Sequence, residues 1–217
     1  VSQKWQPPLH SANPQAQLLG NGSLSSSIST GGGGGLQWRH KALTRFVPDP
    51  VRDDSGLWIY LHDEEDGQLW SATRQPTGQV PDQYDVTFHS HMAEFHRRDH
   101  DISVRMEAVV AAGDDIEIRR LTIDNLGNRR RRLRITSYGE VVLAPPLEDE
   151  RHPAFSKLFV GSEFIPSIGG QLFTRRPRNR SDSPPVLLHF LVSGDGQFVR
   201  SGHESDRRRF VGRNGTM

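Results

Sequence analysis

Apolar and polar residues alternate with a period of two along most of the chain, which is the pattern of half-buried β-strands. In the segment "GLWIYLHDEEDGQLWSA", Trp58 and Tyr60 share one face of a predicted strand. Leu57, Ile59 and Leu61 share the opposite face. The acidic stretch "DEEDG" then supplies a turn and "QLWSA" returns. This segment therefore predicts a β-hairpin that is buried on both faces or strongly aromatic on one.

The middle of the chain continues this alternation. The run "YDVTFHSHMAEFHRRD" predicts a further strand or a pair of strands. In "DIEIRRLTIDNLGNRRRRLRITSYGEVVL", Asn125 and Gly127 supply turn chemistry between one strand and a return strand. The apolar residues before Arg119 and those after Arg120 fall at opposite parity. This phase shift predicts a β-bulge at the two arginines.

The last third of the chain predicts more strands and little helix. We expect strands at "QLFTRR", "VLLHFLVSG" and "QFVRS", and a turn or two of helix at "HPAFSKLFV". The sequence shows no repeat of fixed period. We therefore predict an all-β fold, a large antiparallel β-sandwich rather than a barrel. Residues 1–17 are expected to form an irregular lead-in, and residues 18–217 a single β-sandwich domain.

Composition narrows the classes of function. The 217 residues carry a formal net charge of +1, which offers no global field for nucleic acid, so no nucleic-acid partner is expected. The absence of cysteine excludes disulfides, thiolate metal ligands and a cysteine nucleophile, and it fits a reducing compartment. Because no apolar run approaches the roughly 20 residues that span a bilayer, no direct membrane insertion by this segment is expected. Val1 opens the chain in place of Met, so we expect a piece of a longer polypeptide.

Five consecutive glycines stand in "STGGGGGLQW", residues 29–38. The lysine and hydroxyl residue of a phosphate-binding P-loop do not follow them, and no GxGxxG precedes a helix. Strand-like segments flank the run on both sides, which argues against a domain linker. The run predicts a long hairpin turn, because glycine tolerates positive φ. The alternative is that bare backbone lets a ligand or a neighbouring domain approach closely.

No complete active site is visible in the sequence. The histidines at 89, 91, 96 and 100 lack an HExxH motif and a third ligand at a telling spacing, so no metal site is expected. The arginines of "RRRRLR" are expected on a solvated sheet face, offset by the acidic "DDIE". Most of the carboxylates lie in predicted turns. They do not form a recognisable pair of catalytic carboxyl groups of the kind that glycoside hydrolysis needs.

The aromatic and planar polar residues are the remaining candidates for ligand binding. Aromatic rings stack on sugar faces, and the side chains of arginine and glutamine can hydrogen-bond sugar hydroxyls. Core packing is the competing interpretation for each aromatic residue. The residues concerned are Trp38, Trp58, Trp70, Tyr60, Tyr84 and Tyr138, with Gln75, Arg39 and Arg45 nearby in sequence.

The order of several motifs resembles a known family. These are "GNGSLSSSISTGGGGGLQWRHKALTRFVPDPVRDDSGLWIYLHD", "LWSATRQPTGQVPDQYDVTF", "IRRLTIDNLGN", "TSYGEVVLAPPLEDERHPAFSKLFV" and "ESDRRRFVGR". Together they resemble the amino-terminal domain of inverting β-glucoside phosphorylases, a group that includes the cellobiose and chitobiose phosphorylases. The likeness is to the phosphorylase-like (glycosyltransferase 36 type) region of cyclic β-1,2-glucan synthases, and it runs from about residue 18 to the end of the chain.

The resemblance implies a supersandwich that packs against an (α/α)6 barrel of the same polypeptide. In the family that barrel carries the general-acid Asp, so this segment alone is expected to be inactive, with no catalytic residue of its own. Inorganic phosphate is the co-substrate expected of the full enzyme, and no other cofactor is expected. The family's sandwich continues after the segment that matches "ESDRRRFVGR", so we expect truncation at the carboxyl end.

By resemblance, two loops reach towards the sugar site, and in some relatives this is the site of a partner subunit. They correspond to residues 31–45 and 75–84. The substrate-binding residues expected for a β-glucan oligosaccharide are Trp38, Arg39, Arg45, Gln75, Gln79 and Tyr84.

Three functional hypotheses follow from the residues and the resemblance. The chain is expected to be a carbohydrate-facing accessory domain of a cyclic β-1,2-glucan synthase, cytoplasmic and part of a bacterial inner-membrane protein. The first alternative is the amino-terminal domain of a free-standing inverting disaccharide phosphorylase. The second is a purely structural module for contact between domains or for homodimerisation.

Overall fold

A computed structural model describes residues 4–9, 15–49, 53, 55–194 and 202–212. Antiparallel strands dominate these residues, and the all-β sandwich prediction is confirmed. The chain clusters into two compact units, residues 1–140 and residues 141–217. The stretch 1–17, expected to be irregular, contains a short strand at Lys4–Trp5 and the first residues of a strand that begins at Ala16.

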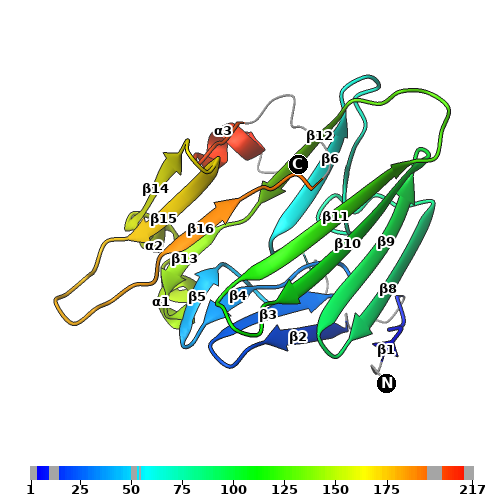
Figure 1. The fold of residues 1–217 in the computed structure, drawn as a ribbon. Helices are drawn as coiled ribbons and strands as arrows, with labels where there is room; N and C mark the ends of the chain where they lie inside the picture. Colours follow the sequence, from blue (N-terminus) through cyan, green and yellow to red (C-terminus); the bar gives the residue numbers. More distant parts are fainter. Residues whose placement is uncertain (1–3, 10–14, 50–52, 54, 195–201, 213–217) are drawn as a thin grey trace. The chain divides into compact units, whose positions relative to one another are not determined.

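Three antiparallel sheets build the first unit (Figure 1). The largest has the order β1-β8-β9-β10-β11, with β1 at Lys4–Trp5, β8 at Gln83–His89, β9 at Met92–Asp99, β10 at Ile102–Val110 and β11 at Glu117–Asn125. The second runs β5-β4-β3-β2, with β2 at Ala16–Gly20, β3 at Leu24–Ser29, β4 at Leu36–Trp38 and β5 at Lys41–Thr44. The third runs β12-β6-β7, with β6 at Trp58–Asp63, β7 at Leu69–Ser71 and β12 at Leu133–Tyr138.

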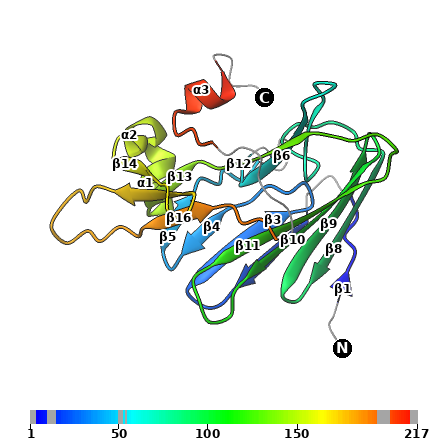
Figure 2. The same cartoon turned by 45° about the horizontal axis from the view of Figure 1, so that its top comes forward.

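One hydrophobic core lies between these sheets. Alternate residues of β8, β9 and β10 point inward and meet side chains from β2, β3, β6 and β7. Figures 1 and 2 show β8–β11 and β2–β5 as two layers, and β10 contacts both β2 and β3. Burial of alternate positions is what the period-two pattern predicts for a sandwich. Central members of this core are Ile28, Leu61, Trp70, Phe95, Val104 and Met106.

In its described residues, the second unit has a smaller antiparallel sheet, β14-β15-β16, and three short helices. The predicted strand at "QFVRS" lies outside the described residues. The predicted helix at "HPAFSKLFV" is confirmed as α2. The elements are β13 (Val141–Ala144), α1 (Pro146–Arg151), α2 (Pro153–Lys157), β14 (Val160–Ile165), β15 (Gly170–Arg175), β16 (Leu187–Phe190) and α3 (Arg207–Val211).

A buried arginine ties the elements of this second unit together. The guanidinium of Arg175 in β15 donates to the backbone oxygen of Val142 at 3.1 Å and to that of Ser156 at 3.0 Å. Burial lowers the pKa of Arg175 from its ordinary value. The strand β13, the helix α2 and the sheet are thereby joined through one side chain.

The predicted hairpin at 56–72 is confirmed as β6–β7, and the strand or pair of strands predicted at 84–99 is the antiparallel pair β8–β9. The predicted β-bulge is wrong, because β10 and β11 pair without interruption from Ile102↔Asn125 to Val110↔Glu117. The apolar residues change parity because Ile118 lies exposed on the outer face, whereas Leu121 and Ile123 pack against the core. The apolar residues therefore switch from one face of β11 to the other without the inserted residue that a β-bulge would add.

The predicted return strand after β11 is also corrected. β11 pairs with β10, whereas β12 pairs with β6 in a different sheet. The turn chemistry of Asn125 is present, since its side chain donates to the Arg129 oxygen at 2.8 Å and accepts from the Gly127 nitrogen at 3.2 Å. That turn carries the chain from one sheet to another rather than back along the same one.

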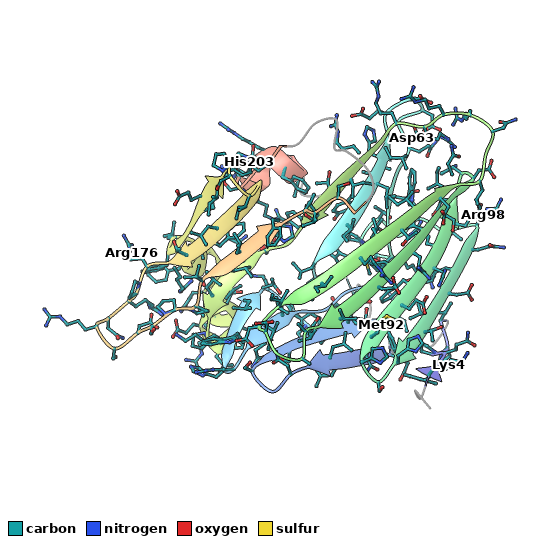
Figure 3. All side chains as sticks on the ribbon, viewed as in Figure 1. Lys4, Asp63, Met92, Arg98, Arg176 and His203 are labelled. Atoms are coloured by element: carbon teal, nitrogen blue, oxygen red, sulfur yellow. The ribbon has the colours of Figure 1, made fainter. Side chains whose placement is uncertain are left out.

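The arginine run lies mainly in this connection and pairs with the β6–β7 turn, not with "DDIE" as expected. Arg131 binds Asp63 and lies 3.2 Å from an oxygen of Asp66. Asp63 stands at the end of β6, where Figure 3 labels it, and is fully buried. Arg134 pairs with Glu64 on the surface. These ion pairs hold the connection to the third sheet.

We predict that Arg131→Met lowers the free energy of unfolding by about 3–5 kcal/mol, because it leaves the Asp63 carboxylate buried and unpaired. The matched control is Arg134→Met, whose side chain is 62% exposed. An exposed ion pair of this kind is worth at most about 1 kcal/mol. Urea denaturation of both variants measures the difference. Equal losses would contradict a special role for the buried pair.

Candidate functional site

The glycine run forms the turn between β3 and β4, as the sequence predicts. The Ser29 nitrogen donates to the Gly33 oxygen at 2.7 Å, and the Gly32 nitrogen donates to the Ser29 oxygen at 2.9 Å. The Ser27 nitrogen then donates to the Gly35 oxygen at 3.0 Å, which leads into the paired part of β4. Residues 31–34 of this glycine loop are buried.

Close packing by the chain itself explains why glycine stands here. At Gly32, where φ is +93°, an added Cβ would overlap the hydroxyl of Thr73 and lie 2.5 Å from its Cβ. At Gly34, where φ is +145°, it would overlap the carbonyl oxygen of Ser27. Only glycine accepts both the left-handed backbone and these contacts. The close approach foreseen at this turn is therefore made by neighbouring segments of the same chain.

An acidic side chain lies directly over the loop. The hydroxyl of Ser29 donates to Oδ2 of Asp53 at 2.5 Å. A Cβ at Gly33 would stand 3.0 Å from Cγ of the same carboxylate, and a Cβ at Gly31 would also contact it. Asp53 has a φ of +46°, an unusual conformation for a residue other than glycine. The glycine loop is thus closed on one side by Asp53.

The segment 73–79 closes the loop on another side. The Gln75 nitrogen donates to the Gly31 oxygen at 2.9 Å, and the Thr73 hydroxyl donates to the Gln75 oxygen at 3.0 Å. The side-chain amide of Gln75 has no hydrogen-bond partner among the described residues, and neither has that of Gln79. Two planar polar groups on this segment are therefore available for hydrogen bonding.

A buried guanidinium holds this segment in place. Arg97 in β9 binds the carboxylate of Asp99 through Nε at 2.6 Å and through Nη2 at 3.1 Å. It also donates to the Thr73 oxygen at 2.5 Å and to the Gln79 oxygen at 3.3 Å. Arg97 is 1% exposed. One side chain thereby anchors both ends of the segment that carries Gln75.

Tyr84 joins the same cluster. It lies directly opposite Arg97 on the neighbouring strand, and its hydroxyl donates to the Thr30 oxygen at 2.7 Å. Burial raises the pKa of the Tyr84 phenol above its ordinary value, so the group remains a protonated donor at neutral pH. The cluster of the glycine loop, Gln75 and Tyr84 is the candidate functional site.

Trp38 and Arg39 lie at the other end of β3. Trp38 is opposite Leu24 at the start of that strand, whereas the glycine loop follows Ser29 at its end, about 16 Å along the strand by the usual rise per residue. The Trp38 indole donates to Oδ2 of Asp115 at 2.6 Å. The Arg39 guanidinium stands 4.4 Å from the centroid of the Trp38 ring.

Arg45 is held by Glu140 through its side chain and its backbone. Its guanidinium binds the carboxylate of Glu140, and its backbone nitrogen donates to the Glu140 oxygen at 2.7 Å. The Tyr138 hydroxyl also donates to Glu140, at 3.3 Å. The structure thus brings Gln75, Gln79 and Tyr84 together, whereas the side chain of Arg45 is engaged with Glu140. Substrate binding by the six predicted residues stays a prediction.

Sequence reasoning missed Arg97 and Thr73 as the supports of the site. A signal for Arg97 was present, because it shares the inward parity of β9 with Ala93 and Phe95, both fully buried. A charged residue at an inward position requires a buried partner, here Asp99. Thr73 gave no such signal, since its role depends on the glycine loop, which lies far away in sequence.

The histidine-rich hairpin β8–β9 forms hydrogen bonds rather than a metal cluster. His96 lies 2.9 Å and His89 3.3 Å from the carboxylate of Glu94. Burial by itself would raise the pKa of Glu94, but these two hydrogen bonds outweigh it and hold the pKa below its ordinary value. Among the residues that the structure describes, no group of three His, Cys, Asp or Glu side chains is placed to bind a metal ion.

No helix in the described ranges has both the length and the apolar character needed to cross a membrane.

Comparison with known proteins identifies related sequences. Residues 4–217 match the family described as "Glycosyl hydrolase 94, supersandwich domain". The chain is 36% identical over 202 residues to the "Cyclic beta-(1,2)-glucan synthase NdvB" of Rhizobium meliloti (strain 1021), covering 92% of this chain and 7% of that protein. It is 25% identical over 160 residues to an "N,N'-diacetylchitobiose phosphorylase" of Vibrio proteolyticus, covering 71% of this chain and 20% of that enzyme.

A protein of Vibrio furnissii with the same name is also 25% identical, over 156 residues that cover 70% of this chain and 20% of that enzyme. The chain therefore spans only a small part of the length of these relatives.

We predict that Gly32→Ala destabilises the fold more than Gly22→Ala. The two glycines have similar φ values, +93° and +99°, so both substitutions incur a similar left-handed backbone cost of about 1–2 kcal/mol. Only the Cβ at position 32 collides with Thr73, whereas nothing lies within 4 Å at position 22. Thermal unfolding of the two variants tests this, and equal shifts would refute close packing of the loop.

We predict that Trp38→Phe raises the pKa of Asp115. Hydrogen bonds from the Ser23 hydroxyl and the Trp38 indole hold the pKa of Asp115 below its ordinary value. Because the folded-state pKa is depressed, the stability contributed by this carboxylate is present above its unfolded pKa and is lost as the pH falls through the folded value. NMR titration of the carboxyl carbon measures the shift. An unchanged pKa would show that the indole hydrogen bond is unimportant in solution.

Proposed function

Because the chain belongs to the family of glycosyl hydrolase 94 supersandwich domains, we propose that it is the carbohydrate-facing accessory domain of a cyclic β-1,2-glucan synthase. The observation that carries the proposal is the 36% identity to such a synthase over 92% of the chain. On this proposal the enzyme is bacterial and bound to the inner membrane, with this domain on the cytoplasmic side.

The domain's role is to shape a sugar site on an adjacent (α/α)6 barrel of the same polypeptide. The barrel supplies the general acid, and inorganic phosphate is the co-substrate that attacks the anomeric carbon. In support, the buried carboxylates of Asp63 and Asp99 are engaged with Arg131 and Arg97. These acids serve the fold, and the chain's contribution to chemistry is to orient the sugar.

The rim that meets the sugar is the candidate site around the glycine loop. Gln75 and Gln79 present side-chain amides without partners among the described residues, beside a backbone that Arg97 keeps fixed. An amide group can donate to one sugar hydroxyl and accept from the next. Since the loop is held before the sugar arrives, little ordering entropy is lost on binding. A β-glucan oligosaccharide is therefore the expected ligand.

The second candidate function is the amino-terminal domain of a free-standing inverting disaccharide phosphorylase. The 25% identity to two chitobiose phosphorylases favours it. N,N'-diacetylchitobiose and a β-1,2-linked gluco-oligosaccharide distinguish the two, since their linkage and acetamido groups differ. A purely structural or dimerising module is the third interpretation, and it predicts binding of neither sugar.

We predict that Gln75→Ala weakens the binding of a β-1,2-gluco-oligosaccharide about threefold to tenfold, which corresponds to one lost hydrogen bond. The matched control is Gln68→Ala in the exposed β6–β7 turn, and it should leave affinity unchanged. Calorimetry is performed on the chain alone and joined to the barrel. A loss of affinity at unchanged thermal stability supports the proposal. Absence of sugar binding in both forms would refute it and favour the structural module.

A further inference from the structure

A hollow lies at the His89 end of strand β8 in the large sheet. Its cavity volume is about 330 Å³, within the range of small-molecule clefts, roughly 300–1,000 Å³. Figure 3 labels Lys4 and Met92 at this end, and both face His89 in the strand register. The residues that line the hollow are Lys4, Trp5, Gln17, Phe88, His89 and Ser90.

Trp5 supplies an aromatic surface to this hollow. Its ring packs against Phe88, with centroids 5.8 Å apart and an interplanar angle of 53°. Phe88 is buried in the core and therefore gives the indole a firm support, yet Trp5 itself remains 46% exposed. A single exposed aromatic residue is common on protein surfaces and does not define a site. The polar groups around it decide what it can bind.

Those polar groups are available for hydrogen bonding. The Gln17 amide donates to the His89 backbone oxygen at 3.2 Å, which fixes the side chain over the hollow. In the described part of the chain, the Gln17 amide oxygen, the Lys4 ammonium and the Ser90 hydroxyl have no protein partner. An aromatic face bordered by donors and an acceptor matches a sugar ring, which has apolar faces and a rim of hydroxyls.

We propose that this hollow is a second sugar-binding subsite, which takes a glucosyl unit of an extended β-glucan chain stacked on Trp5. The inference rests on the proposed function, because the ligand is the same polysaccharide. Tyr84 and His89 lie five residues apart on β8, a separation of about 16 Å. A single sugar unit cannot extend from Tyr84 to His89. A longer oligosaccharide can place one unit at the glycine loop and another in the hollow.

The test uses the 217-residue chain, a β-1,2-gluco-oligosaccharide of several units and the corresponding disaccharide. Trp5→Ala should weaken binding of the long oligosaccharide about tenfold, because the stacking surface is lost. Trp5→Phe should retain most of the affinity. Leu18→Ala is the matched control, since Leu18 is an exposed apolar residue beside Gln17 that does not line the hollow.

Two readouts separate this inference from the proposed function. The oligosaccharide should protect the fluorescence of Trp5 from iodide quenching and shift the amide NMR signals of Lys4 and Ser90. Both effects should occur in the unmodified chain and in the Gln75→Ala variant. If the quenching protection and the NMR shifts are seen and Gln75→Ala binds the oligosaccharide with unchanged affinity, the subsite is supported and the role of the glycine loop is refuted. A loss in Gln75→Ala alone, with affinity unchanged in Trp5→Ala, would overturn the subsite and leave the proposed function standing. If Trp5→Ala does not fold, the NMR shifts in Trp5→Phe decide, and their absence overturns the subsite.

Discussion

The buried ion pair of Arg97 and Asp99 is the interaction on which the candidate site depends. A guanidinium in the core is costly unless its donors are satisfied, and here a carboxylate and two backbone oxygens accept from it. Those two oxygens belong to Thr73 and Gln79, the ends of the segment that covers the glycine loop. The cost of burying the charge is thus offset by fixing a surface segment to a strand of the sheet, and Gln75 takes its position from that attachment.

The glycine loop is the part of the chain against which the segment 73–79 packs. Its backbone passes so close to Thr73, Asp53 and Ser27 that side chains at Gly32, Gly33 and Gly34 would collide with them. Segments distant in sequence therefore meet here through backbone hydrogen bonds and short side chains. Close contacts and backbone hydrogen bonds therefore define this arrangement.

Alternation predicted the strands well because burial imposes it on each strand separately. It could not predict that β12 leaves β11 and pairs with β6, since a strand's own pattern does not specify its neighbour. The partner of Arg131 was missed for the same reason, because Asp63 lies at the end of β6, in another sheet. For the site, motif resemblance predicted Gln75 and Tyr84, which the structure brings together beside the glycine loop. It also grouped Trp38 with them, although Trp38 lies at the other end of β3.

The two proposed sugar contacts differ in how firmly they are held, and this suggests different roles. Around the glycine loop the polar groups stand on a backbone fixed by a buried charge, so their directions are set before a ligand arrives. Hydrogen bonds of fixed direction discriminate between sugars, because a misplaced hydroxyl leaves a donor or acceptor unsatisfied. Trp5 lies on the two-residue edge strand β1. A sugar ring stacked on its indole is not fixed by directed hydrogen bonds and can shift across the aromatic face. Stacking of this kind adds affinity along a polysaccharide with little selectivity. If both proposals hold, we therefore expect discrimination between sugars at the glycine loop and retention of the chain at Trp5.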